Sequence, residues 1–306
     1  MNTGTWYAVS AYTLWGLLPV YWKWLRHVPA LQLMSHRVVW SFVSLCTFLV
    51  ITRRWSRFRA AIGDKRVLRI HLITAALIGI NWLTYVWAVN AGFVVETSLG
   101  YFINPLLSVA LGVIFLRERL RPLQWTAVGI AAMGVFYLTF IYGTFPWIAL
   151  TLALAFGFYG LVKKTAPMGS LYGLTLETGI LLPPTLGYLL FWEIQGEGAF
   201  LHTGPLFDLL LVGAGPTTAV PLLLFAAAAQ RIPLSLVGIL QYIAPTLQFL
   251  LGVLVYHEPF PPTRFVGFSL VWIALAILAL DAGLTRRARI PVKPRKHRRH
   301  RGPQQD

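Results

Sequence analysis

Two charged side chains, those of Arg37 and Glu177, lie well inside otherwise apolar stretches of the sequence, 140 positions apart. Arginine presents a planar fork of donors that suits carboxylates, and an intramembrane carboxylate can hold a proton or an ammonium group. We therefore expect Arg37 to bind an anionic group of a substrate and Glu177 to bind a proton or a cation. The two side chains would face one shared cavity from opposite sides and would form an ion pair in one conformational state. The alternative is that helix-packing partners satisfy each charge locally.

Other polar and aromatic residues recur at helical spacing, so that each set shares one face of a helix. Burying polar groups in lipid is costly, which favours a pathway through the interior. The residues that we assign to a substrate or ion pathway are Tyr12, Trp15, His36, Arg37, Asn81, Trp82, Tyr85, Glu96, Tyr101, Asn104, Glu177, Gln241, Tyr242 and Gln248. The alternatives are that the Asn and Gln side chains join helices and that Trp and Tyr residues are interfacial anchors.

Glu96 begins the polar stripe of the fourth predicted helix. We expect its carboxylate to face a water-filled interior near the outer side, where it would bind a proton or a cationic group. The alternative is an ordinary acidic residue at a helix N-terminus, which the helix dipole favours.

The composition of the chain indicates a membrane protein. It is 57% hydrophobic and only 12% charged, whereas soluble domains carry roughly 25% charged residues. Runs without Asp, Glu, Lys or Arg reach the roughly 20 residues that span a bilayer. We predict an all-α integral membrane protein with ten transmembrane helices, the fifth and tenth of them peripheral. The predicted ranges are 4–22, 31–52, 71–91, 95–116, 123–141, 146–163, 171–191, 206–229, 234–256 and 264–283.

The sequence contains an internal repeat. Residues 101–122 and 241–262 agree at eight of 22 positions, among them a proline, a glycine and the pair Glu118 and Glu258. Repeats in an apolar chain are typical of transporters. Five helices in each half would insert the second half upside down, which gives two inverted five-helix repeats. We predict a first repeat at 1–143, a second, inverted repeat at 144–284, and a basic, disordered cytoplasmic tail at 285–306.

The net charge of +16 suggests nucleic-acid binding when taken alone, but the placement of the charges favours a membrane topology. Nearly all Lys and Arg residues follow even-numbered helices or lie in the tail, and only Lys23, Arg26 and Arg264 lie on the opposite side. The positive-inside rule then predicts that both termini are cytoplasmic. His297 and His300 are read as part of a solvated tail rather than as a metal pair, because no Cys or acidic ligand accompanies them.

Six segments together resemble the RarD group of the EamA branch of the drug/metabolite transporter superfamily. They are AYTLWGLLPVYWKWL near the start, SHRVVWS at 35–41, NWLTYVWAVN at 81–90, ETSLGYFINPLLSV at 96–109, LETG at 176–179 and PLLLFAAAAQRIPLSLVGILQYIAPT at 221–246. The resemblance extends to about residue 283. It implies a central cavity lined by helices one to four and six to nine, with helices five and ten outside. The group is named for chloramphenicol sensitivity, and the resemblance implies no particular substrate.

The sequence therefore predicts a secondary transporter in the bacterial inner membrane that moves a small metabolite or drug-like molecule by alternating access, with a proton as one candidate coupling ion. Gly213–Pro216 lacks the Gly-Lys-Ser/Thr ending of a phosphate-binding loop, and no motif for a catalytic triad or a metal site is present in the spans. We assign no enzyme activity and no cofactor. The expected partners are a small-molecule substrate and the lipid bilayer, not nucleic acid, and the oligomeric state is left open. The alternative is a membrane-embedded receptor or enzyme without transport.

Overall fold

The chain folds into a bundle of helices. The computed structural model describes residues 2–257 and 262–288, except for the side chains of residues 94, 95, 142, 262–264 and 282–288. Within these ranges no residue belongs to a β-strand. The helices are α1 (Thr3–Trp24), α2 (Ala30–Ile51), α3 (Trp55–Ile62), α4 (Lys65–Asn90), α5 (Val94–Leu116), α6 (Pro122–Tyr142), α7 (Trp147–Thr165), α8 (Ser170–Ile194), α9 (Pro205–Ala229), α10 (Leu234–Gln241), α11 (Ile243–Leu250), the π-helical turn η1 (Leu251–Val255) and α12 (Pro262–Ala288).

Eight helical segments of the described chain are long and apolar enough to cross a membrane. They are α2, the helices α4 to α9, and the continuous segment Leu234–Val255, while α12 contains the shorter apolar stretch Phe265–Asp281. Helical structure also occupies each of the ten ranges predicted from the sequence. The prediction of an all-helical membrane protein is therefore confirmed, and the number of spans stays a prediction.

Three local details differ from the sequence-based expectation. The basic loop after α2 contains the short helix α3, whose Phe58 is buried against Val67 and Leu176. The predicted helix 234–256 is interrupted at Tyr242, near Pro245, which has no N–H to bond the carbonyl four residues earlier. The chain is still helical at residues 285–288, so the predicted disordered tail begins too early. Glu258, His297, His300 and the rest of the tail lie outside the described residues.

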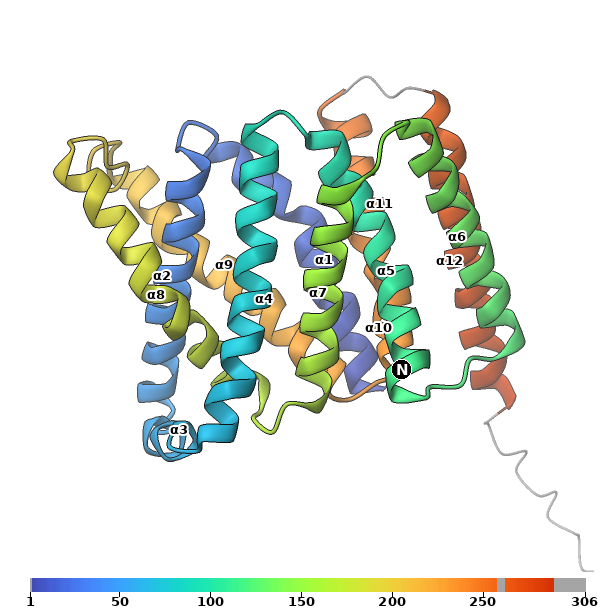
Figure 1. Ribbon diagram of the computed structural model, residues 1–306, viewed down its shortest axis with the longest axis horizontal. Helices are drawn as coiled ribbons and strands as arrows, with labels where there is room; N and C mark the ends of the chain where they lie inside the picture. The colour runs from blue at the N-terminus through green and yellow to red at the C-terminus, as the bar shows by residue number, and fades with distance from the viewer. Residues whose placement is uncertain (1, 258–261, 289–306) are drawn as a thin grey trace, which may run out of the picture.

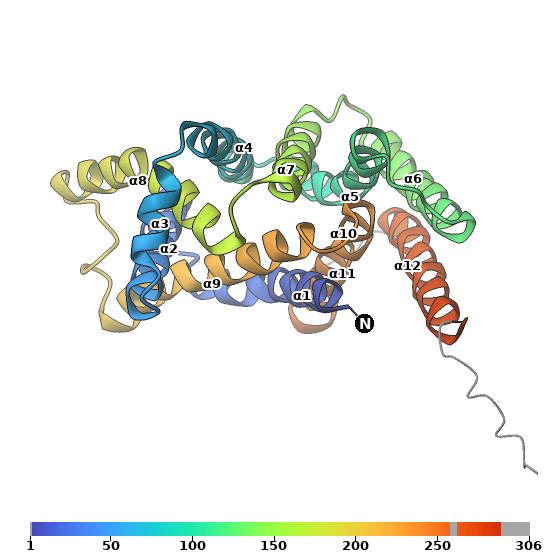
Figure 2. The same cartoon turned by 90° about the horizontal axis from the view of Figure 1, so that it is seen from below.

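Successive long helices run in opposite directions between an upper and a lower end of the molecule (Figure 1). Seen from below, α6 and α12 lie together at one edge, beside the main group of helices (Figure 2). Small residues of α6 such as Ala127 and Ala131 pack against Val271 and Ala274 of α12. Phe140 of α6 is 86% exposed. This arrangement agrees with the peripheral location expected for the fifth and tenth predicted helices.

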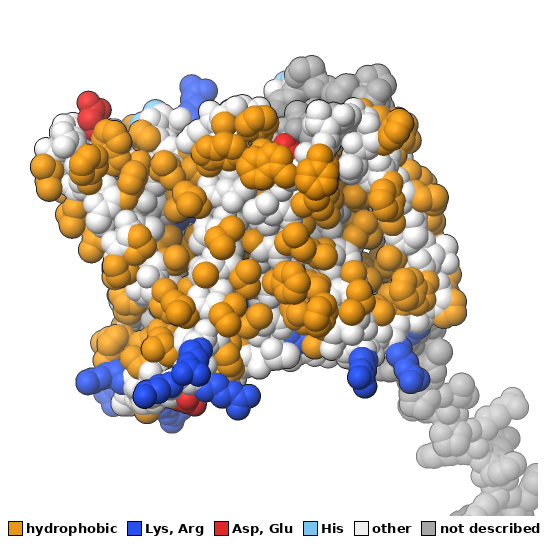
Figure 3. Space-filling view, in the orientation of Figure 1, with side chains coloured by type: hydrophobic (Ala, Val, Ile, Leu, Met, Phe, Trp, Pro, Cys, Tyr) orange, Lys and Arg blue, Asp and Glu red, His pale blue; other side chains and the backbone are white. Residues whose placement is uncertain are grey.

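The surface has the pattern of a membrane protein. Hydrophobic side chains cover the broad middle of the face in Figure 3, and Lys and Arg side chains gather at its lower edge, over α3 and near the junction of α5 and α6. The N-terminus and the loops that join α2 to α4, α7 to α8 and α9 to α10 lie at this lower end (Figure 1). The basic residues are therefore concentrated at one end of the bundle.

The contact between α2 and α9 depends on a glycine. A Cβ atom at Gly215 would overlap the backbone of Trp40 and Ser41, and Ser41 Oγ already donates to the Gly215 carbonyl at 2.9 Å. We expect Gly215→Ala to destabilise the protein by about 1–3 kcal/mol, the usual cost of overpacking, measured by thermal unfolding in detergent. The matched control is Gly129→Ala on α6, where no atom of the described chain lies within 4 Å of the added Cβ apart from the backbone of that helix and the neighbouring residues. Equal shifts in the two variants would contradict this account.

Candidate functional site

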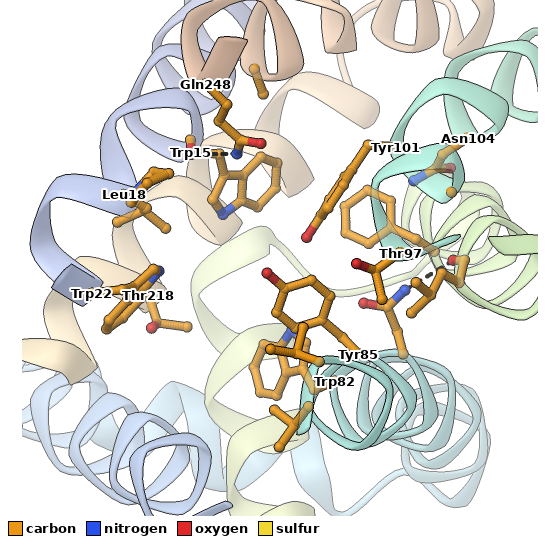
Figure 4. A pocket seen from close by; sticks show the side chains of 18 of the residues that line it. Trp15, Leu18, Trp22, Trp82, Tyr85, Thr97, Tyr101, Asn104, Thr218 and Gln248 are labelled. Atoms are coloured by element: carbon orange, nitrogen blue, oxygen red, sulfur yellow. Dashed lines mark hydrogen bonds between the residues drawn. The ribbon is translucent and has the colours of Figure 1, made fainter. Parts of the chain in front are cut away.

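A central cavity of about 350 Å³ lies among α1, α2, α4, α5, α7, α9, α10 and α11. Its wall contains side chains from both halves of the sequence, many of them shown in Figure 4. Ten of the predicted pathway residues line it: Tyr12, Trp15, Arg37, Asn81, Trp82, Tyr85, Tyr101, Asn104, Gln241 and Gln248.

Among the described residues that line this cavity, Arg37 is the only one with a charged side chain. Its Nε donates to Thr218 Oγ1 at 3.0 Å, and its guanidinium carbon lies 4.8 Å from the ring centroid of Trp22 and 5.4 Å from that of Trp82. No carboxylate of the described chain forms an ion pair with it. The guanidinium is thus held by aromatic faces and one hydroxyl, and an anionic ligand would supply its missing counter-charge.

Aromatic rings form much of the cavity wall. The rings of Tyr85 and Tyr101 are 6.1 Å apart at 68°, and those of Trp15 and Phe156 are 5.8 Å apart at 76°. In Figure 4 the hydroxyl groups of Tyr85 and Tyr101 point toward the open space between α1, α4 and α5. Flat aromatic faces with polar tips suit a planar, apolar ligand body that carries a few polar groups.

Unsatisfied polar atoms are concentrated at this cavity. Tyr12 Oη, Asn104 Oδ1 and Gln241 Oε1 are buried and have no hydrogen-bond partner in the part of the chain that the structure describes, and all three residues line it. Buried polar atoms are rarely left unpaired, so each such atom calls for an explanation. The amide oxygens of Asn104 and Gln241 would accept hydrogen bonds from a bound molecule.

Two other amides do join helices, as the alternative interpretation anticipated. Asn81 Nδ2 donates to the Leu152 carbonyl at 2.9 Å, which links α4 to α7. Gln248 Nε2 donates to the Trp15 carbonyl at 3.2 Å, which links α11 to α1. Both residues also line the cavity, so packing and lining are compatible roles here.

Glu177 does not line the cavity, contrary to expectation, and it does not pair with Arg37 in this conformation. The reason is that Lys163 supplies its counter-charge, with Nζ 2.8 Å from Glu177 Oε1 and both side chains fully buried. The carboxylate also accepts hydrogen bonds from its remaining partners, His71 Nδ1 at 3.0 Å, Thr74 Oγ1 at 2.6 Å and Tyr159 Oη at 3.1 Å. The charge of Glu177 is therefore satisfied by residues of the helices that pack around it, which is the alternative given above.

Glu96 also lies outside the cavity and is only 3% exposed. Its Oε1 accepts from the backbone N–H of Ile148 at 2.7 Å, in the first turn of α7. Glu118 does the same for α10, accepting from Leu234 N at 2.7 Å and Ser235 N at 2.8 Å. The first N–H groups of a helix have no partner within it. The expectation that Glu96 faces a water-filled interior is therefore wrong, and its carboxylate caps a neighbouring helix.

The other two predicted residues are also elsewhere. His36 lines a second cavity of about 300 Å³ together with Phe200, whose ring centroid is 5.7 Å away. Tyr242 is buried, and its hydroxyl donates to the Phe102 carbonyl at 3.2 Å. Each of the two is next to a polar residue that does line the cavity, since His36 precedes Arg37 and Tyr242 follows Gln241. Adjacent positions on a helix point in different directions.

Several cavity residues were not predicted from the sequence. Trp22 ends the first predicted helix, 4–22, where a Trp is ordinarily an interfacial anchor, yet its ring lies against Arg37. Thr218 was not singled out, although it is a polar residue between two prolines of the apolar helix α9. Phe156 carried no polar signal at all. Lys163 and His71 are at the ends of their predicted helices, 146–163 and 71–91, so nothing in the sequence marks them as partners of Glu177.

The cavity is closed toward the lower end of the molecule. A set of rings that we call the aromatic layer consists of Tyr12, Trp15, Phe156, Tyr159 and Phe225, whose neighbouring centroids are 5.0–6.3 Å apart. In the other direction the cavity wall extends to residues near the upper ends of α1, α2, α4 and α5, namely Trp22, Ala30, Val89 and Thr97. The cavity therefore faces the upper end.

Comparisons with known proteins agree on the class of molecule. The sequence model of the EamA-like transporter family matches residues 2–140. A protein RarD from Streptomyces exfoliatus is 48% identical over 94% of this chain and 91% of its own length. An uncharacterized transporter, YojE, from Bacillus subtilis is 48% identical over 93% of this chain and 96% of its own. A protein from Pseudomonas aeruginosa named chloramphenicol-sensitive protein RarD is 33% identical over 90% and 93%.

A solved crystal structure, 20% identical in sequence, superimposes with a TM-score of 0.68 over 92% of this chain and 99% of that chain, which supports the fold. The helices, the cavity and these relatives together define a multi-pass membrane protein of the transporter class. The chain belongs to the EamA-like transporter family, in its RarD group.

Proposed function

We propose that this protein is a secondary transporter of the bacterial inner membrane that moves a small organic anion with a planar apolar body by alternating access. The observation that carries the proposal is the position of Arg37. It is the single charge of an aromatic cavity and has no counter-ion among the described residues. An unpaired cation in such a place is costly, and a site that binds anions explains why it is there. No enzyme activity and no nucleic-acid partner form part of this proposal.

The proposal includes ten spans in two inverted repeats, residues 1–143 and 144–284. The repeat would relate α1 to α7, α2 to α8, α4 to α9, α5 to the α10–α11 segment and α6 to α12. Each contact between two helices should then recur between the two helices that are equivalent to them in the other repeat. In support, α1 packs on α9 as α7 packs on α4, and α5 packs on α7 as α11 packs on α1. The pairs α2 with α8, α5 with α10 and α6 with α12 each join helices that the repeat makes equivalent.

The orientation follows from the charges. The basic lower end would be cytoplasmic by the positive-inside rule, with both termini on that side. The cavity would then be open to the outside and closed to the cytoplasm by the aromatic layer. Because inverted repeats can exchange their roles, a second conformation would open the lower end and close the upper one.

The substrate class can be tested with pairs of ligands of similar size and shape, one anionic and one neutral. Benzoate and benzenesulfonate should bind the purified protein at least about tenfold more tightly than benzamide and benzenesulfonamide, since a charge-assisted contact contributes more than 1.4 kcal/mol. Titration calorimetry in detergent measures the difference. Equal affinity within each pair would show that Arg37 does not select anions.

Transport is tested with benzenesulfonate, which stays charged at neutral pH and crosses lipid slowly. We expect labelled benzenesulfonate to enter proteoliposomes faster than it enters protein-free liposomes. The entry rates measured with and without an imposed pH gradient are compared to reveal proton coupling. Met133→Ala on the peripheral helix α6 is the matched control, since Met133 is 56% exposed and lies outside the cavity. Binding without protein-dependent entry would indicate a receptor instead.

A further inference from the structure

A second polar cluster lies on the lower side of the aromatic layer, where α4, α7 and α8 meet. We call it the gate cluster, and it consists of His71, Thr74, Tyr159, Lys163 and Glu177. The side chains of His71, Lys163 and Glu177 are all fully buried. A buried ion pair of this kind often adds little to stability compared with apolar packing, and ionisable residues in membrane spans are usually functional.

One atom of the gate cluster has no partner. An ionised carboxylate can only accept hydrogen bonds, so His71 Nδ1, 3.0 Å from Glu177 Oε1, must carry a hydrogen. In the neutral ring Nε2 then holds a lone pair. That atom is buried and has no hydrogen-bond partner in the described chain. A methyl group at Gly173 would come within 2.8 Å of both His71 Cε1 and Lys163 Nζ, so a glycine leaves room for these two side chains.

We infer that His71 is the proton-coupling site of the transporter, and that its Nε2 binds a proton when the lower end opens to water. This inference rests on the proposed transport function. The proton comes from water on the cytoplasmic side and forms a bond to the Nε2 lone pair. The imidazolium then pairs with Glu177 and takes the place of Lys163, whose ammonium group is released to water.

The closed structure indicates in which direction pH should shift the equilibrium between the closed and open states. A proton on Nε2 here would add a second buried cation beside Lys163 and an N–H group without an acceptor. Water provides that acceptor once the lower end opens. The open state therefore binds the proton more tightly, and by linkage a lower cytoplasmic pH favours the open state. Histidine is the side chain whose charge ordinarily changes between pH 5 and 8.

The gate cluster is connected to the cavity through packed rings. Tyr159 donates its hydroxyl to Glu177 Oε2 at 3.1 Å, and its ring stacks on Phe225 with centroids 6.0 Å apart at 14°. Phe225 is 5.0 Å from Phe156, which lines the cavity. A movement that separates the aromatic layer would therefore pull Tyr159 away from Glu177.

Groups beyond the gate cluster do not compete for this role. Three more helices contact α4, namely α2, α3 and α5. The arginines of α3 are exposed, Glu96 of α5 caps the upper end of α7, and Cys46 of α2 has no hydrogen bond or ion pair with a described residue. The remaining titratable side chains of α2 and α5 line one of the two cavities: His36, Arg37 and Tyr101.

The test follows opening of the lower end with a reporter cysteine and requires no substrate. Ala8 is fully buried and packs with Ile232 and Leu234 on the lower side of the aromatic layer. Ala8→Cys, with Cys46→Ser to remove the native thiol, is placed in lipid nanodiscs and treated with a membrane-impermeant maleimide from pH 8 to pH 6. Each rate is divided by that of the same protein unfolded in SDS, which removes the pH dependence of the thiol itself.

We expect the normalised rate to rise as the pH falls, by up to about tenfold per pH unit, the limit for one linked proton. His71→Asn, which keeps a donor to Glu177 but cannot titrate, should abolish the rise. His71→Gln is a second variant should the first fail to fold, and His36→Gln is the matched control that should keep the rise. A rate that is independent of pH, or a rise that survives in both His71 variants, would overturn the inference. Neither outcome depends on which solute the cavity binds.

Discussion

Arg37→Ala should reduce the affinity for benzenesulfonate at least about 30-fold while leaving the protein folded. Truncating one partner of a desolvated charge pair costs roughly 2 kcal/mol or more. Unfolding should change little, because the guanidinium has no carboxylate partner in the described chain that its removal would leave unpaired. Calorimetric titration and thermal unfolding of the same preparation measure both quantities.

Two control variants show whether the effect belongs to the site. Arg37→Lys keeps the charge but loses the planar fork that stacks on Trp22 and Trp82, so its affinity should be intermediate. Arg231 also stacks on a ring, that of Tyr7, but lies outside the cavity, and Arg231→Ala should bind normally. An unchanged affinity in Arg37→Ala would remove Arg37 from the binding site.

Glu177→Ala should be strongly destabilising, by about 3–5 kcal/mol, because it leaves the buried Lys163 ammonium without a counter-charge. Lys163→Met should destabilise as well, since the carboxylate would lose its only permanently charged neighbour among the described residues. The double variant should recover much of the loss, because it buries no unpaired charge. Thermal unfolding of the wild type, the two single variants and the double variant completes a double-mutant cycle. Additive losses would show that the two charges are not coupled.

The sequence predicted the class of fold well, because long apolar runs and the residues that separate them are local signals. The helix α7 is one example, since it starts at Trp147 and the predicted range starts at residue 146. The break at Tyr242 was not predicted, although Pro245 follows it by three residues in the sequence. The matching Pro105 leaves α5 continuous, so a proline alone does not determine where a helix breaks. The short helix α3 was not predicted, because it lies in a segment rich in basic residues.

The candidate site was predicted in part, for a physical reason. Helical spacing shows which residues share a face, as for Asn81 and Tyr85, but not which helix that face meets. Arg37 and Glu177 look equivalent in sequence, yet one lies in the cavity and the other in the gate cluster. Only the packing of α7 against α4 and α8 reveals that Lys163 and His71 reach the same carboxylate. Such long-range pairings leave no local trace in one sequence.

The most direct test of the central claim is counterflow. Proteoliposomes loaded with unlabelled benzenesulfonate are diluted into buffer that contains a trace of the labelled compound. A carrier that exposes one site alternately to each side should accumulate label transiently above its equilibrium level. The account predicts this overshoot for the wild-type protein and its loss in Arg37→Ala. Label that enters without an overshoot, or that does not enter faster than in protein-free liposomes, would contradict alternating access through this cavity.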